Sequence, residues 1–108
     1  MLKKLENTAP ELHPFRPDIF RYNGKIFLLK DRLECDIEYK DNFYFIKYKP
    51  LEISVWSATR DEVEDAFYFS FYSLYEDFVL EDDKNLSTKA IALKGRLKKL
   101  INKVLDEG

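Results

Sequence analysis

Apolar and polar residues alternate with a period of two over residues 19–57. This alternation is typical of strands that bury one face, because successive side chains point to opposite faces of a sheet. The pattern predicts a hairpin over residues 19–29, where Asn23-Gly24 suits a tight type I′ turn. It predicts three further strands at residues 33–39, 43–49 and 51–57. Pro50 favours an edge or corner position for the last of them.

The two central strands have a register that matches side chains on both faces. If Asp41-Asn42 forms a two-residue turn, Ile37 faces Ile46 on one side of the sheet. The same register pairs Tyr39 with Tyr44, Cys35 with Tyr48, Asp36 with Lys47 and Glu34 with Lys49. Each matched pair contributes about 0.2–1 kcal/mol, and a slip by one residue would destroy both patterns. We therefore predict this pairing.

The period changes to that of a helix after the last strand. Thr59 and Glu62 form a capping box, which predicts a helix from Thr59 to about Leu80. A second helix is expected from about Ser87 to about Leu105. Its apolar stripe consists of Leu86, Ala90, Leu93, Leu97, Leu100 and Val104. The predicted fold is α+β: a small antiparallel-rich sheet of about four to five strands, followed by two C-terminal helices packed on it.

The chain is expected to form one domain with an extended arm. Three prolines in the first 17 residues block helix continuation, so residues 1–17 are predicted to be an extended arm and residues 18–108 a single α+β domain. The single cysteine cannot form an intramolecular disulfide, which favours a reducing compartment. There is no secretory apolar segment and no stretch of about 18 apolar residues, so we expect a cytoplasmic protein without a membrane partner.

The predicted first helix carries more aromatic residues than one buried face needs. One stripe contains Val63, Phe67, Phe71, Leu74 and Phe78, and a second, rotated stripe contains Tyr68, Tyr72, Tyr75 and Val79. One stripe is enough to dock a helix on a sheet. The second must be covered by the C-terminal helix, by a partner or by a second copy in a homodimer. Tyr68, Tyr72 and Tyr75 are therefore candidate partner-binding residues.

A second candidate surface is the outward face of the predicted strands. Phe43, Phe45, Lys47 and Trp56 fall on this face. Exposed aromatic residues on a sheet can stack on single-stranded nucleic acid. Acidic residues share the face, however: Glu34, Asp36, Glu38 and Glu52. A mixture of aromatic and charged side chains suits a protein partner better.

Charge is unevenly distributed along the chain. The formal net charge of −2 excludes a globally basic nucleic-acid binder. Residues 61–83 nevertheless contain nine acids and no base, and residues 84–105 contain seven bases and no acid. Antiparallel helices would bring the acids at 61–65 close to Lys98, Lys99 and Lys103. The alternative is a solvated basic stripe for phosphates or an acidic partner, with Lys94, Arg96, Lys98, Lys99 and Lys103 as candidate nucleic-acid contacts.

Residues with catalytic chemistry are sparse. His13 is the only histidine and lies in the predicted arm, and Cys35 alternates inward as a small apolar residue. Glu81-Asp82-Asp83 could hold a divalent cation, but no spaced ligand set accompanies it, and no glycine-rich loop could hold a phosphate. We expect no catalytic residues, no cofactor, no metal and no enzymatic activity. A metal-dependent enzyme built on acidic residues is kept as an alternative.

The segment from Asp41 to Val79 resembles the HicB-like antitoxin domain. The matching pieces are Asp41-Asn42-Phe43-Tyr44-Phe45-Ile46, then Pro50-Leu51-Glu52-Ile53, then Ala58-Thr59-Arg60-Asp61-Glu62-Val63-Glu64-Asp65-Ala66. The family usually has glycine at the position of Ala58, and a DNA-binding domain where this chain has one basic helix. The resemblance therefore does not extend to operator binding.

The resemblance implies an antiparallel-rich sheet covered by helices and a role in sequestering a small ribonuclease toxin. On this basis we expect a non-enzymatic protein-binding module that masks a small basic partner. Two alternatives remain beside the metal-dependent enzyme. One is a nucleic-acid-binding protein that uses the basic C-terminal helix, and the other is a homodimeric structural or interaction protein.

Overall fold

The computed structural model describes residues 11–107 and contains six strands in two antiparallel sheets. The strands are β1 (Ile19–Tyr22), β2 (Lys25–Leu29), β3 (Asp36–Lys40), β4 (Phe43–Tyr48), β5 (Ile53–Ser57) and β6 (Ile101–Asp106). The α-helices are α2 (Arg60–Leu74) and α3 (Thr88–Leu100). Short helical turns are η1 (Lys49–Leu51), η2 (Tyr75–Val79, a π-helix) and η3 (Asp83–Asn85). The α+β prediction is confirmed, but there are two sheets instead of one.

Strand orders are β3-β4-β5 in one sheet and β1-β2-β6 in the other. The predicted central register is confirmed within the β3-β4 ladder, where Ile37 pairs with Ile46 and Asp36 with Lys47. The two outermost predicted pairs lie beyond this ladder. Cys35 forms a bridge with Phe15, so the predicted facing of Cys35 and Tyr48 is not part of the ladder.

Glu34 does not pair with Lys49, the base that the predicted register placed opposite it. The ion pair of Glu34 is with Arg16, at 2.9 Å, and not with Lys49. Its partner comes from the segment predicted to be an extended arm, which lies against the start of β3. Residues 1–10 of that predicted arm lie outside the described residues. Phe15 is 5% exposed and belongs to the core, so the end of the arm is anchored.

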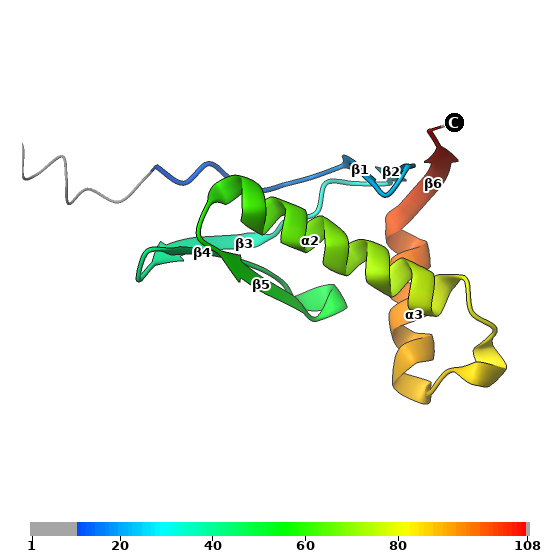
Figure 1. Ribbon diagram of the computed structural model, residues 1–108. Coiled ribbons are helices and arrows are strands. Elements are labelled where there is room, and N and C mark those ends of the chain that lie inside the picture. The colour runs from blue at the N-terminus through cyan, green and yellow to red at the C-terminus, as the bar shows by residue number, and fades with distance from the viewer. Residues whose placement is uncertain (1–10, 108) are drawn as a thin grey trace, which may run out of the picture.

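The prediction for the last residues of the chain was wrong. The second helix ends at Leu100, and the chain continues as β6, which pairs antiparallel with β2. The sheet therefore joins the two ends of the domain, as Figure 1 shows for the blue and red segments. The predicted strand at residues 51–57 also begins later, because Leu51 belongs to η1 and β5 starts at Ile53.

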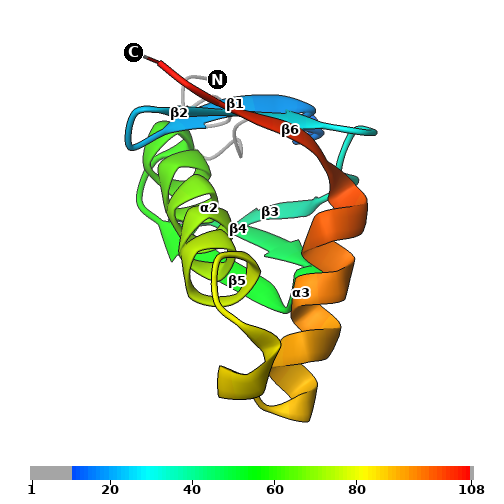
Figure 2. The same ribbon diagram turned by 90° about the vertical axis from the view of Figure 1, so that its right-hand side faces the viewer.

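Helix α2 packs against both sheets. In Figure 2, the β1-β2-β6 sheet lies above α2 and the β3-β4-β5 sheet lies beside it. Phe71 is fully buried, with its ring centroid 5.2 Å from that of Phe20 and 6.0 Å from that of Phe27. Phe67 is also fully buried, and its ring centroid lies 6.4 Å from that of Tyr48 of β4. Each such aromatic pair contributes about 0.5–1.5 kcal/mol beyond its area burial, so α2 joins the two sheets into one core.

Two glycines provide a paired test of the backbone. Gly24, in the β1-β2 turn, has φ +76°, whereas Gly95 lies inside α3 and a Cβ there would meet nothing within 4 Å. Gly24→Ala is expected to destabilise the fold by about 1 kcal/mol, because a Cβ is disfavoured at positive φ. Gly95→Ala is expected to stabilise it by about 0.5–1 kcal/mol through helix propensity. Urea unfolding measures both, and a destabilised Gly95→Ala would contradict the open space at that position.

Candidate functional site

An aromatic cluster covers one end of the outer surface of the β3-β4-β5 sheet. Strand alternation places Phe43, Phe45 and Trp56 outward, and we call these three residues the aromatic face. Trp56 is 62% exposed and Phe43 is 36% exposed. Their ring centroids lie 5.2 Å apart in an edge-to-face arrangement. Phe45 lies opposite Trp56 in the β4-β5 register, so it belongs to the same face as the two contacting rings.

The aromatic face is exposed because α2 covers only the opposite surface of the same sheet. Inward residues of this sheet, such as Ile46 and Ile53, are buried in the core. Large exposed aromatic side chains are energetically unfavourable in water, and a contiguous apolar patch rimmed by polar groups is typical of an interaction surface. Exposure and register place Phe43 and Trp56 outward as predicted, and Phe45 lies on the same face but is half-buried.

Charged side chains lie beside the aromatic face on β3 and β4. The Lys40 Nζ lies 5.9 Å from the centroid of the Phe45 ring, close enough for a cation–π interaction. Glu38 lies opposite Phe45, and exposed Lys47 lies opposite Asp36. Both signs of charge therefore occur on β3 and β4, as the sequence predicted. Such a mixed rim around an aromatic centre is the usual anatomy of a protein interface.

Acidic residues lie just beyond the aromatic face in the chain. Only Ser57, Ala58 and the N-cap Thr59 separate Trp56 from α2. The Thr59 hydroxyl accepts a hydrogen bond from the Glu62 amide, so the predicted cap is confirmed. In the first turns of α2, three acids are exposed and make no ion pair with any of residues 11–107: Asp61, Glu62 and Asp65. No base among residues 11–107 neutralises these three carboxylates through an ion pair.

The predicted neutralisation of these acids by the second helix does not occur. The ion pair at the start of α2 is local, between Arg60 and Glu64 at 2.6 Å. Lys98, Lys99 and Lys103 form no ion pair within the described part of the chain. The reason is topological: α3 packs near η1 and η2 and then continues into β6, so it does not run alongside the first turns of α2.

The second aromatic stripe of α2 is occupied within the chain. Tyr68 stacks on Phe20 with ring centroids 4.6 Å apart, and Tyr75 meets Phe27 at 5.1 Å. Tyr72 is 6% exposed. Its hydroxyl accepts a hydrogen bond from Asn23 Nδ2 at 2.9 Å and donates one to Glu76 Oε2 at 2.8 Å. The β1-β2-β6 sheet thus covers this stripe, which needs no second copy, and the three tyrosines do not join the aromatic face.

The five candidate nucleic-acid contacts fall into two groups. Lys94 is engaged locally: its Nζ donates to the Glu81 carbonyl at 2.6 Å and lies 2.9 Å from Asp83 Oδ1. The other four are exposed and form no ion pair among residues 11–107: Arg96, Lys98, Lys99 and Lys103. The basic stripe is therefore smaller at its N-terminal end than the sequence suggested.

Cys35 is a poor nucleophile in this fold. Burial raises the pKa of its thiol to about 12, with smaller contributions from the charges of Asp36 and Glu34. Since the thiolate is the reactive form, the neutral thiol at physiological pH is inert. Its packing against the core agrees with the predicted role as a small apolar residue. His13 is exposed, and its backbone carbonyl accepts a hydrogen bond from Arg60.

The acidic segment at residues 81–83 is engaged in structural contacts. The Glu81 carboxylate accepts from Asn85 Nδ2 at 2.9 Å and from the Asp82 amide, which lowers its pKa. Asp83 pairs with Lys94. Within residues 11–107, no group of three or more His, Cys, Asp or Glu side chains is arranged to hold a metal ion. None of the described helices is both long and apolar enough to cross a membrane.

A surface groove escaped the sequence-based prediction. It lies between η1, the end of α2 with η2, and the start of α3, and its apolar lining consists of Leu51, Leu74, Phe78, Ala90 and Leu93. An ion pair between Lys89 and Glu52, at 3.1 Å, lies at its rim. Three segments distant in sequence form this groove, so no local sequence pattern could predict it.

Comparisons with known proteins give no assignment. The chain matches no family model, and no similar protein was found among curated proteins or solved structures.

Proposed function

We propose that this chain is a non-enzymatic protein-binding module that uses the aromatic face to mask a small basic protein. The observation that carries the proposal is Trp56, which is 62% exposed and in edge-to-face contact with Phe43. Tryptophan side chains dominate the binding energy of many protein interfaces, because they bury a large area with little loss of conformational entropy. Trp56 lies on the edge strand β5, with the charged side chains of β3 and β4 to one side of it, and this exposed edge position supports the role.

The charge of the partner follows from the free acids at the start of α2. Asp61, Glu62 and Asp65 are exposed and make no ion pair with residues 11–107. They follow closely after Trp56 in the chain and share the helix N-terminus. A basic partner that covers the aromatic face would be attracted by these carboxylates, which increases the association rate and opposes acidic competitors.

The class of partner comes from the resemblance to the HicB-like antitoxin domain. In that family the partner is a small ribonuclease toxin, whose RNA-binding surface is basic. We propose the same class of partner for this chain, held by steric and electrostatic masking of its RNA-binding or catalytic surface. Exposed Phe43 and half-buried Phe45 belong to the segment that carries the resemblance, which supports placing the contact there.

Affinity capture from cells that carry this gene tests the proposal. The wild-type chain is expected to retain a small basic protein at moderate salt, and Trp56→Ala is expected to reduce its yield at least about tenfold, as for an interface tryptophan. Phe69→Ala is the matched control, because Phe69 is 56% exposed but lies on α2 away from the aromatic face. Equal yields from wild type and Trp56→Ala would contradict the proposal.

A further inference from the structure

We propose that five basic residues form a binding site for the phosphate backbone of single-stranded nucleic acid, separate from the aromatic face. We call them the basic row: Lys49, Arg96, Lys99, Lys30 and Lys103. Three of them belong to the basic stripe noted in the sequence, and the fold adds Lys49 and Lys30. All five are exposed. They come from η1, α3, the loop after β2 and β6.

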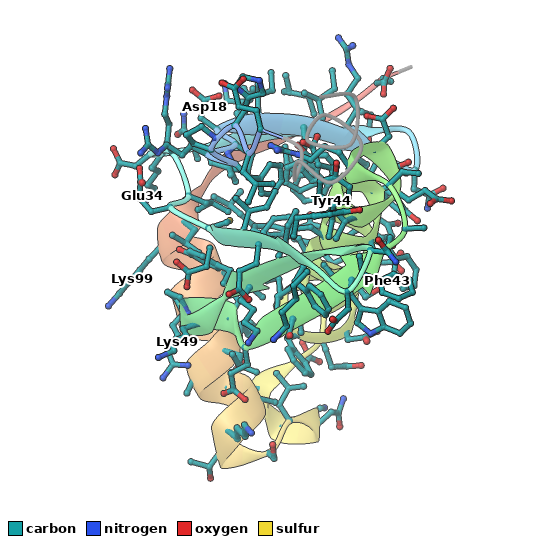
Figure 3. The ribbon with its side chains drawn as sticks, turned by 90° about the vertical axis from the view of Figure 1, so that its left-hand side faces the viewer. Asp18, Glu34, Phe43, Tyr44, Lys49 and Lys99 are labelled. Carbon is teal, nitrogen blue, oxygen red and sulfur yellow. The ribbon has the colours of Figure 1, made fainter. Side chains whose placement is uncertain are left out.

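The first half of the row is assembled where α3 meets η1. Arg96 Nη1 donates a hydrogen bond to the Pro50 carbonyl at 3.4 Å, which brings Arg96 beside Lys49, the residue before that proline. Lys99 follows Arg96 by three residues, and residues three apart are neighbours on a helix surface. Figure 3 shows Lys49 and Lys99 projecting from the same side of the molecule.

The second half is assembled where α3 ends. The Lys30 amide donates to the Leu100 carbonyl at 2.9 Å, so Lys30 lies beside the helix turn that carries Lys99. Lys103 pairs with Leu28 across the β2-β6 ladder, two residues before Lys30. Because the register shifts between Leu28 and Leu29, Lys30 contacts the Leu100 carbonyl, three residues along the chain from Lys103. The links run continuously from Lys49 to Lys103.

The positive charge of the row is not cancelled by ion pairs with residues 11–107. None of its five members forms an ion pair with any residue from 11 to 107. Two nearby acids are already engaged, Glu34 with Arg16 at 2.9 Å and Asp18 with Arg32 at 3.9 Å. Asp31 is the exposed acid next to Lys30 in the chain. The row therefore keeps a net positive charge even though the protein as a whole carries −2.

The chemistry of the row favours nucleic acid over an acidic protein. Protein interfaces have an apolar or aromatic centre that is depleted of charge, whereas the row consists of cations alone. Phosphate contacts need only exposed bases, and their binding energy comes largely from released counterions. The row bends from a helix over a loop to a strand, and a flexible single strand can follow this path better than a stiff duplex.

The basic row and the aromatic face are far enough apart to act independently. Phe43 is the first residue of β4, and Lys49 directly follows the last. Six residues of strand separate them by about 20 Å. Figure 3 shows the two labelled side chains at opposite ends of the sheet.

Fluorescence anisotropy with the purified full chain tests this site. The probes are a labelled 20-nucleotide single-stranded RNA, the DNA of the same sequence and the corresponding duplex. We expect at least one single strand to bind more tightly than the duplex, with log affinity falling against log salt at a slope of about −2 to −3.5 for three to five phosphate contacts. Lys99→Glu and Lys30→Glu are each expected to weaken binding at least about tenfold and to reduce the slope by about 1.

Lys84→Glu is the matched control, because Lys84 is also exposed and unpaired within residues 11–107 but lies in η3, before the other end of α3. It should leave the affinity within about twofold of wild type. Three results would overturn the proposal: neither single strand binds at low salt, Lys84→Glu weakens binding as much as Lys99→Glu, or the duplex binds more tightly. Competition by polyglutamate as effective as by unlabelled RNA would also overturn it, in favour of an acidic protein.

Discussion

Replacing Phe71 by alanine is expected to destabilise the fold by about 3–5 kcal/mol, the usual cost of emptying a buried phenylalanine site. Phe71 is fully buried, and its ring meets Phe20 and Phe27 of one sheet and Phe67 of its own helix. The substitution therefore removes the contacts that hold α2 against β1 and β2. For a chain of 108 residues, a loss of this size is a large fraction of the total stability.

The control is on the same helix, two residues away. Phe69 is 56% exposed, so Phe69→Ala should change the free energy of unfolding by less than about 1 kcal/mol. Urea unfolding followed by circular dichroism measures both variants. If the two substitutions had similar effects, α2 would not be packed between the two sheets as described.

A chain that ends after Leu100 is expected to lose about 3 kcal/mol or more of stability. This truncation deletes β6, including Ile101 and Val104, whose side chains pack against the core. A buried aliphatic side chain contributes about 1.5–3 kcal/mol when fully removed from water. The deletion also leaves β1 and β2 as a two-stranded hairpin, and such a hairpin is only marginally stable by itself.

Hydrogen exchange distinguishes this effect from a general loss of helix. The amides of β2 that face β6 should lose protection from exchange in the truncated chain. The amides of the β3-β4 ladder should still exchange only through global unfolding. Leu105→Ser is the control, because Leu105 is 41% exposed and the strand remains in place. Unchanged protection in β2 after truncation would contradict its pairing with β6.

Local patterns were sufficient to predict the central hairpin. The alternation around Ile37 and Ile46, with Asp36 opposite Lys47, allows one register only, and the structure has this register. The capping box at Thr59 likewise identified the start of α2 to within one residue. In both places the signal is contained within a few neighbouring residues, so no knowledge of distant contacts was needed.

The end of α3 could not be predicted in this way. Leu97, Leu100 and Val104 fit the helical period, and no glycine or proline marks a boundary between them. The strand forms because Val104 pairs with Phe27, a contact between residues far apart in sequence. This tertiary contact overrides a weak helical pattern. The same strand completes the sheet that covers the second aromatic stripe. The missed strand therefore also explains why this sheet was not considered as the cover of that stripe.

The two proposed surfaces differ in how far the sequence predicted them. Strand alternation alone placed Phe43, Phe45 and Trp56 on an outward face. The basic row was predicted only in part, because Lys49 and Lys30 join it through the Arg96 contact with the Pro50 carbonyl and the Lys30 contact with the Leu100 carbonyl. These contacts depend on how α3 packs, which the sequence pattern did not contain.

The intrinsic fluorescence of Trp56 tests the proposed protein-binding function most directly. Trp56 is the only tryptophan of the chain and lies on the aromatic face, 62% exposed. The titrant is a tryptophan-free variant of the basic protein that the wild-type chain captures. As this protein binds and buries the indole, the emission maximum of Trp56 should shift to shorter wavelength. This shift is expected to saturate together with the binding curve. Saturable binding with an unchanged emission spectrum would contradict it.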